Sequence, residues 1–332
     1  MTGSNPASGT RIQITGVGLA LPGATSAAEL LRQTPAPAEP FDTAQVIGKR
    51  GHRYKDRATQ LALCAAIDGL RDAGLIPADS EELAVPGTSM GVVASSNLGN
   101  LDTVCGAAEQ INRESVGAIS PMGLPNASSN VVASHVAIRF KLRGPNLMLC
   151  NGPTSGLDAV HWAANLIAAD RVRRALVIGV ETRNEIVEGL LRTEAAELLD
   201  GAVALVVESA EAAAERGAAP VAELGRYRRQ AGLDGCLEPL LADPDQQRPA
   251  PGIWFTPERY APDGTAPVPA SVPRHDLSRA FGRSSGALGV LQCAAATGWL
   301  AAQGSGRALL TNGDDSADAV ASLLLDRPGA DS

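Results

Sequence analysis

The stretch from Gly144 to Glu181 is the part of this 332-residue sequence that most constrains its fold. Leu147 to Cys150 is a short apolar run typical of a fully buried strand, and turn-forming residues follow it from Asn151 to Ser155. Apolar residues then recur at helical spacing, and a second apolar run spans Ala175 to Val180. The pattern predicts a strand, a tight turn, a helix and another strand, with the free amides of the helix start pointing at the turn.

Strand and helix patterns alternate over most of the remaining chain, which indicates an α/β protein. The predicted strands are 11–19, 90–94, 200–208, 220–227, 307–311 and 320–325, and the predicted helices are 56–74, 131–140 and 210–217. A further apolar helix is predicted to open at 281–289 and to run to about residue 302. Residues 228–275 differ, because they hold nine Pro residues and little periodicity. Within them, 252–256 resembles a short strand. The first ten and last five residues have the composition of disordered tails.

Composition excludes several classes of function. The chain is 45% hydrophobic but only 3% aromatic, so its core must consist mainly of Ala, Val, Leu and Ile. A net charge of −8 without a basic cluster argues against nucleic acid as a partner. No apolar run approaches the roughly 20 residues of a membrane helix, so no membrane association is expected. Five scattered Cys residues without metal-ligand spacing predict reduced, mostly buried thiols in a cytoplasmic protein.

The turn at 151–155 resembles the nucleophile elbow of the β-ketoacyl synthases, which have a thiolase-like fold. Gly144-Pro145, eight further residues and Thr154-Ser155-Gly156 reproduce the spacing of that family. The opening strand, the Ala-Ile-Asp-Gly-Leu-Arg-Asp-Ala-Gly-Leu helix at 66–75, the strand at 201–208 and the turn at 281–289 are similar as well. The resemblance implies a duplicated, five-layered α-β-α-β-α arrangement, here with a shortened second half.

The chain departs from the family at its catalytic positions. Pro153 stands where the resemblance places the catalytic Cys, and Pro supplies neither a thiol nor a backbone N–H for an oxyanion. Arg283 stands where the second His is expected, and an always-charged guanidinium is no base. No His-Gly-Thr turn follows residues 252–256. The resemblance therefore implies that no catalytic residue remains.

Other residues do not rebuild the catalytic set. Cys150 is expected inside the strand and buried, and Thr154 and Ser155 are expected to cap the helix. His161 is expected to pack within the protein or face a partner, and His275 to be exposed in a Pro-rich loop. Gly16-Val17-Gly18 lacks the rest of a dinucleotide fingerprint. No cofactor and no metal is expected.

A scaffold without catalytic residues resembles the chain-length factor subunit of type II polyketide synthases. Thr154-Ser155-Gly156-Leu157-Asp158-Ala159 is similar to the elbow of that subfamily, as is Arg283 with its Ser/Gly-rich sequel. The resemblance implies a heterodimer with a Cys-bearing ketosynthase and contact with acyl carrier protein, mainly through that ketosynthase. Pro153 is a departure, because chain-length factors often carry Gln there, and they are longer.

The chain would then shape the tunnel for the growing polyketide or polyene and be inactive alone. The candidate tunnel or interface residues are Cys105, Gln110, Ile111, Asn146, Met148 and Cys150. Residues 105–119 are equally well explained as a surface helix. Two alternatives remain: a stand-alone acyltransferase with an unrecognised nucleophile, and a scaffold that binds acyl carrier protein.

The resemblance also divides the chain. It implies an N-terminal thiolase-like half at 11–227 after the tail at 1–10, a degenerate segment at 228–275, and a C-terminal remainder at 276–326.

Overall fold

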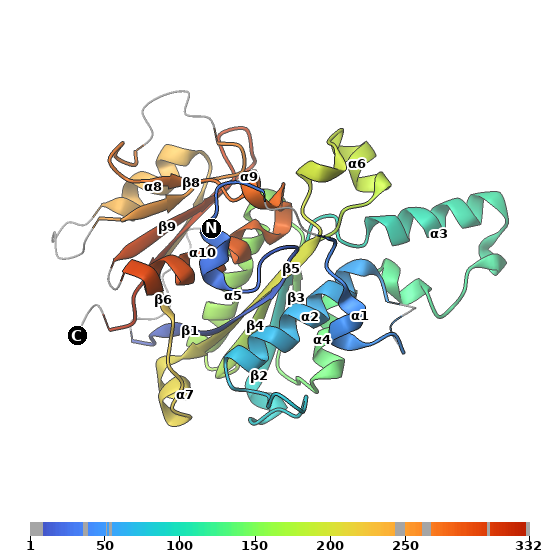
Figure 1. Cartoon of the computed structure of the whole chain (residues 1–332), viewed down its shortest axis with the longest axis horizontal. Coiled ribbons are helices and arrows are strands. Elements are labelled where there is room, and N and C mark those ends of the chain that lie inside the picture. Colours follow the sequence, from blue (N-terminus) through green and yellow to red (C-terminus); the bar gives the residue numbers. More distant parts are fainter. Residues whose placement is uncertain are drawn as a thin grey trace.

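The computed structural model describes residues 9–35, 39–50, 52, 55–242, 250–260, 267–303 and 306–329. Most of the predicted tails, namely residues 1–8 and 330–332, lie outside this part. The described residues form one ten-stranded sheet with helices on both faces (Figure 1). Its strands are β1 (Ile12–Ala20), β2 (Met90–Ser95), β3 (Asn146–Leu149), β4 (Arg174–Glu181), β5 (Gly201–Ser209), β6 (Ala222–Gln230), β7 (Ile253–Phe255), β8 (Arg274–His275), β9 (Arg307–Asn312) and β10 (Val320–Asp326).

The strand order shows the internal duplication. The sheet runs β3-β2-β4-β5-β1 and continues as β6-β10-β9-β7-β8. Counted from its outer edge, each half therefore has the order 3-2-4-5-1. The directions agree too, since β2 and β7 each have two parallel neighbours while β5 and β10 pair antiparallel on both sides. The halves join where Gln13 and Ile14 of β1 pair with β6.

Helices form three layers around the two half-sheets, which confirms the five-layered thiolase-like arrangement. The helices are α1 (Thr43–Ile47), α2 (Arg57–Asp72), α3 (Leu101–Arg113), α4 (Val131–Arg139), α5 (Ser155–Ala168), α6 (Glu185–Leu191), α7 (Ala210–Glu215), α8 (Leu233–Leu241), α9 (Ser278–Phe281) and α10 (Leu288–Gln303). The central layer, α5 and α10, packs between the half-sheets. The outer layers are α2 with α4 on the first half, and α8 on the second.

The alternation of strand side chains explains these layers. In β4, Ala175 and Val177 belong to the central core, whereas Leu176, Ile178 and Val180 belong to the core under α2 and α4. Successive strand residues point to opposite faces, so a strand covered on both sides must be apolar at every position. The continuous apolar run of β4 therefore predicts the two-sided burial that the structure shows.

Two predictions about local structure need correction. The strand at 147–150 was expected to be fully buried, but β3 is the edge strand of the sheet and its side chains are exposed or only partly buried. An apolar run in the sequence cannot show whether a strand has one neighbour or two. In the Pro-rich stretch, the strand at 252–256 is confirmed by β7, but α8 also forms there around an internal Pro239.

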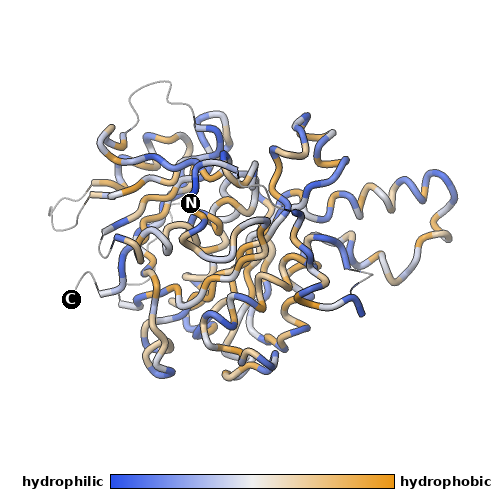
Figure 2. The backbone as a smooth tube through the Cα atoms, in the orientation of Figure 1, coloured by the Kyte–Doolittle hydropathy of each residue, from blue (hydrophilic) through white to orange (hydrophobic). Residues whose placement is uncertain are grey.

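The helix α3 extends away from the layered body (Figure 1). None of its residues is buried, although hydrophobic residues recur along its length (Figure 2). This agrees with the interpretation of residues 105–119 as a surface helix. The short helices η3 (Val116–Ala118) and η4 (Leu124–Ala127) lead back to the body.

One helical segment, Ser285–Gln303, is long and apolar enough to cross a membrane, but 78% of it is buried inside the protein. It contains α10, which contributes Val290, Leu291 and Ala294 to the central core. Its composition is therefore explained by its position between two sheets.

Candidate functional site

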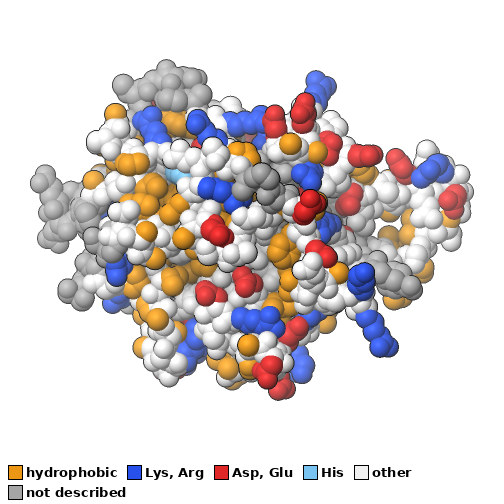
Figure 3. Space-filling model, viewed as in Figure 1, with side chains coloured by type: hydrophobic (Ala, Val, Ile, Leu, Met, Phe, Trp, Pro, Cys, Tyr) orange, Lys and Arg blue, Asp and Glu red, His pale blue; other side chains and the backbone are white. Residues whose placement is uncertain are grey.

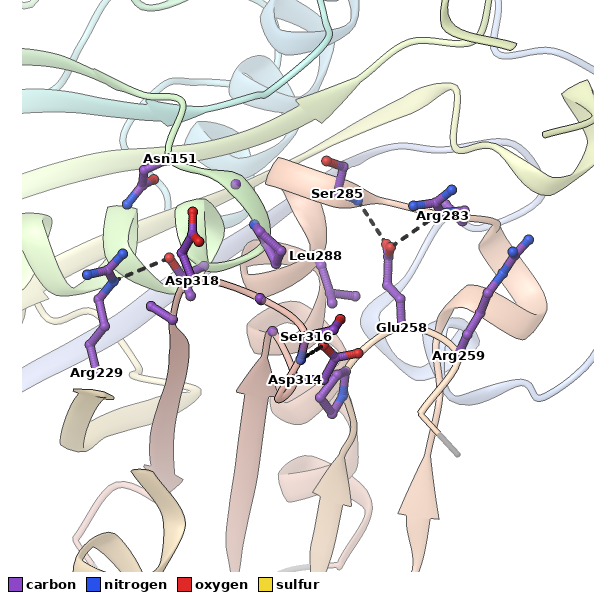
Figure 4. A pocket seen from close by; sticks show the side chains of 17 residues that line it. Asn151, Arg229, Glu258, Arg259, Arg283, Ser285, Leu288, Asp314, Ser316 and Asp318 are labelled. Carbon is purple, nitrogen blue, oxygen red and sulfur yellow. Dashed lines mark hydrogen bonds and ion pairs between the residues drawn. The ribbon is translucent and has the colours of Figure 1, made fainter. Parts of the chain in front are cut away.

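A cavity of about 610 Å³ lies where the two central helices begin. On one side, the turn η5 (Gly152–Thr154) connects β3 to α5, and on the other η7 (Ser285–Ala287) leads into α10. The loop after β7 and the β9–β10 connection complete the walls (Figure 4). The lining residues are Asn151, Gly152, Pro153, Thr154, Arg229, Pro257, Glu258, Arg259, Arg283, Ser285, Leu288, Gly313, Asp314, Ser316, Ala317, Asp318 and Ala319.

The helices can meet here because each presents a glycine. A Cβ on Gly156 of α5 would lie 2.5 Å from the backbone N of Gly289, and a Cβ on Gly289 of α10 would lie 2.2 Å from the N of Leu157. No side chain fits such a contact, so the two helix starts approach backbone to backbone. Near this close approach, Pro153 and Arg283 both line the cavity.

Asn97, in the loop after β2, connects the two turns. Its Nδ2 donates to Gly152 O and to Ser285 Oγ, both at 2.9 Å. Its Oδ1 accepts from Gly152 N at 3.3 Å and from Ser155 Oγ at 3.0 Å. With all its hydrogen-bonding positions used, Asn97 holds η5 against η7 and stabilises the shape of the cavity.

Two carboxylates accept hydrogen bonds from the backbone amides of residues 284–286, just before α10. Glu258 accepts from Ser284 N and, at 2.8 Å, from Ser285 N, and its Oε2 lies 3.9 Å from Arg283 Nε. Glu181, at the end of β4, accepts from Gly286 N at 3.0 Å. Burial raises the pKa of Glu258, and the two amides and Arg283 act against it. Burial raises the pKa of Glu181 to about 7, against hydrogen bonds from Asn97, Leu98, Gly286 and Ser96.

The polar side chains in the wall formed by α5 also pair with groups of the same chain. Asp158 accepts from Thr154 Oγ1 at 2.8 Å and from Asn151 Nδ2 and Tyr227 Oη. Arg229 lies 3.5 Å from Asp158. Thr154 occupies the N-cap position of α5 but makes no side-chain cap hydrogen bond, so its expected role as a cap is wrong. The lining holds Arg229, Arg259 and Arg283 against Glu258, Asp314 and Asp318, so opposite charges balance.

The chemistry available in the cavity is limited. Its lining contains no Cys and no His, so it offers neither a thiolate nor an imidazole. Pro153 has no amide hydrogen, and the amides of Ser284 and Ser285 already bond to Glu258. The cavity keeps a shape into which a ligand could fit, and the ionisable side chains of its lining are carboxylates and guanidinium groups. Among the described residues, no group of three or more His, Cys, Asp or Glu could hold a metal ion.

The structure corrects the prediction for Cys150. This residue follows β3 and its side chain is exposed, where a buried strand residue was expected. Burial of part of the side chain and the charge of Glu181 raise the pKa of its thiol, which disfavours the reactive thiolate. The other cysteines largely follow the expectation, since Cys64, Cys236 and Cys293 are buried while Cys105 is half-buried, and all are free thiols.

The structure also corrects the prediction for His275. It is buried in β8, with its ring 5.5 Å from that of Phe255, where an exposed loop residue was expected. His161 stacks on Tyr227 with 4.0 Å between ring centroids, as expected of a packed residue. Neither lines the cavity.

The six tunnel or interface candidates lie outside the cavity. Cys105, Gln110 and Ile111 are on α3, where Gln110 Nε2 donates to Ala118 O at 3.1 Å. Asn146 and Met148 are on the edge strand β3, and Cys150 follows it. Pro153 and Arg283 thus line one cavity, and none of these six residues does.

Sequence reasoning missed Glu181 and Glu258. Glu181 ends a well-predicted strand, but nothing in the sequence indicates that its carboxylate reaches the start of α10. Glu258 lies in the Pro-rich stretch, where periodicity is weak.

The family comparison agrees with this geometry. The model of the "Beta-ketoacyl synthase, N-terminal domain" family matches residues 33–200. The chain is 28% identical over 207 residues to "3-oxoacyl-[acyl-carrier-protein] synthase 2" of Vibrio harveyi, covering 55% of this chain and 49% of that protein. It is 28% identical over 264 residues to "Granaticin polyketide putative beta-ketoacyl synthase 1" of Streptomyces violaceoruber, covering 65% and 62%. The chain thus spans about half the length of the curated relatives it matches.

Solved structures extend the likeness over nearly the whole chain. A structure described as "The ishigamide ketosynthase/chain length factor" matches with a TM-score of 0.77 and 25% identity, covering 97% of this chain and all of that one. A β-ketoacyl synthase from Burkholderia phymatum shares the fold with a TM-score of 0.71 at 16% identity. The duplicated sheet, the elbow between β3 and α5 and the matched family model together show that this chain belongs to the β-ketoacyl synthase family.

Proposed function

We propose that this chain is a non-catalytic, chain-length-factor-like subunit that pairs with an active ketosynthase during polyketide or polyene elongation. The observation that carries the proposal is the cavity between α5 and α10. It keeps the form of an active site but is lined by Pro153 and Arg283 and by no Cys or His. The likeness to a ketosynthase/chain length factor structure supports it.

The reaction explains why these replacements matter. Decarboxylative condensation requires a thiolate that holds the acyl chain, imidazoles that promote loss of carbon dioxide, and donors for the developing oxyanion. Pro153 removes the thiol together with one amide donor, and Arg283 replaces an imidazole with a permanent cation. The chemistry then has to take place on the partner.

The exposed apolar surface supports a protein partner. Of the ten large apolar side chains that are exposed in the described residues, seven belong to α3, η3, η4, α4, α5 and the turn before η4. They are Val104, Ile111, Val116, Met122, Leu124, Ile138 and Trp162, here called the β3 face because α4 and α5 both contact the edge strand β3. An edge strand flanked by exposed apolar side chains is a site for pairing with another chain.

The charged side chains on one face of the protein favour a partner surface that carries both positive and negative groups. Lys, Arg, Asp and Glu side chains are interspersed around α6 and α3 on the face shown in Figure 3. Such a surface is a poor sole platform for an acidic carrier protein, so the acyl carrier protein would be held mainly by the ketosynthase. The proposed compartment is the cytoplasm, in agreement with the free thiols of the five cysteines.

Restoring the thiol is expected not to restore condensation. Pro153→Cys returns a thiol and an amide hydrogen to η5, but position 283 still lacks an imidazole and Glu258 still accepts from η7. The isolated variant should show no decarboxylation of malonyl thioesters above wild type, measured by mass spectrometry of the products. Condensation by Pro153→Cys alone would show that Arg283 and Glu258 are no obstacle. Thiol alkylation of Pro153→Cys, with wild type as the control, checks that the new side chain is accessible.

The decisive experiment is co-expression with a candidate intact ketosynthase and acyl carrier protein. A 1:1 complex that elongates malonyl units, and ceases to do so when this chain is omitted, supports the proposal. A stable homodimer that ignores the ketosynthase contradicts it.

The alternative function, a stand-alone acyltransferase, depends on an unrecognised nucleophile. Cys150 is the exposed thiol nearest in sequence to the elbow, but it lies outside the cavity lining and its thiol pKa is raised. Turnover of acyl thioesters by the isolated chain would favour this alternative. Binding of acyl carrier protein without a ketosynthase would favour the scaffold function.

A further inference from the structure

The backbone at the start of the α10 segment has the form of an anion-binding nest. Ser284 has right-handed dihedral angles (φ −108°, ψ −8°), and Ser285 follows with φ +41°, an unusual value for a residue with a side chain. Successive residues of right- and left-handed conformation direct consecutive N–H groups to one side, where they form a concavity that binds anions. The amides concerned are those of Ser284, Ser285 and Gly286.

Both anions in this nest belong to the chain itself. Glu181, which does not line the cavity, accepts from Gly286 N and is also held by the amides of Asn97 and Leu98. Glu258 accepts from Ser284 N and Ser285 N on the cavity side, beside Arg283 (Figure 4). Glu258 is therefore the occupant that separates two of the nest amides from the cavity.

We propose that Glu258 acts as a built-in ligand that closes this cavity to carboxylate groups from outside. The side chain lies three residues beyond the end of β7, and its carboxylate fills the position at which a free carboxylate would accept from Ser284 N and Ser285 N with Arg283 beside it. The cavity of about 610 Å³ has room for an acyl carboxylate, but its donors are already engaged. The carboxylate of Glu258 therefore occupies the nest and prevents an external carboxylate from binding to the same amides.

This inference is independent of the proposed partnership with a ketosynthase. It concerns the isolated chain, so its failure would leave the heterodimer experiment untouched. It adds that the cavity is closed to anionic ligands as well as deprived of catalytic groups.

Chemical rescue tests the proposal on the full chain. Glu258→Ala removes the carboxylate and leaves charge-assisted donors unpaired, so the melting temperature should fall by about 3–6 °C. Sodium malonate or acetate, compared with sodium chloride at equal ionic strength, should restore much of that loss in a saturable way. The wild-type chain should show no saturable response, because its own carboxylate occupies the nest.

Two further variants complete the design. Asp314→Asn changes another carboxylate of the same cavity, whose Oδ1 accepts from Ser316 N and Ser316 Oγ of its own turn, and it should gain no response to malonate. Glu258→Gln fills the same space without charge and should not be rescued. Equal saturable responses of wild type and Glu258→Ala, or none in Glu258→Ala, would overturn the proposal. If Glu258→Ala folds in sodium malonate but not in sodium chloride, that recovery supports the proposal. If the variant folds in neither salt, the proposal is overturned.

Discussion

Replacing Gly289 by Ala is expected to lower the free energy of unfolding by about 3 kcal/mol. The added Cβ would lie 2.2 Å from Leu157 N, 2.6 Å from Asn312 Oδ1 and 2.6 Å from the carbonyl carbon of Gly156. Two of these atoms are backbone of the facing helix, so the methyl group cannot be accommodated by rotating a side chain. The helices α5 and α10 must move apart, which disturbs the central core. Denaturant unfolding measures the change.

The matched control is Gly235→Ala in α8. No atom lies within 4 Å of a Cβ built on Gly235, so Ala should fit there and stabilise the helix by roughly 0.5–1 kcal/mol. The opposite signs of the two substitutions separate the close approach of α5 and α10 from the general effect of Gly in a helix. If Gly289→Ala unfolds at the same denaturant concentration as wild type, α5 and α10 do not approach each other as closely as described.

Trp162→Ala is expected to weaken the complex with a ketosynthase at least roughly 30-fold, equivalent to about 2 kcal/mol. Trp162 belongs to the β3 face and is 49% exposed on α5, although α5 packs within the central layer. Large aromatic side chains of this kind dominate the binding energy of interfaces when a partner covers them. The dissociation constant, measured by calorimetry with the purified ketosynthase, tests the expectation.

Val46→Ala provides the control for the interface. Val46 is 41% exposed on α1, outside the β3 face, so its truncation should change the dissociation constant by less than about twofold. Both variants should keep the melting temperature of the wild-type chain within a few degrees, since each side chain is largely exposed. A Trp162→Ala variant that binds as tightly as wild type would place the partner on another surface.

Much of the fold could be predicted because its determinants are local and periodic. The two-sided apolar runs of β4 and β5, the helical spacing in α2 and α5 and the Gly-Pro before the elbow identify the elements and their order. The position of Pro153 at the elbow and of Arg283 before α10 is what the resemblance to the β-ketoacyl synthases implies. These residues do lie at one cavity.

Other features depend on which segments meet in space. Cys150 is exposed just beyond the edge strand β3, whereas His275 is buried in β8 at the opposite edge, where its ring lies 5.5 Å from that of Phe255 in β7. Both side chains were predicted wrongly from the residues around them. Neighbours in sequence do not specify which side chains of other elements cover a residue at the edge of a sheet.

The sequence by itself determined the succession of strands and helices and the absence of a thiol and an imidazole at two family positions. The tertiary structure alone decided what occupies the cavity instead. Glu258 and Glu181 come from the first residues beyond β7 and the last residue of β4, and they meet the amides of η7 only because the duplicated halves pack across α5 and α10. The physical reason is that a local pattern specifies which face of an element is apolar, whereas hydrogen bonds between distant turns depend on how the elements are placed relative to one another.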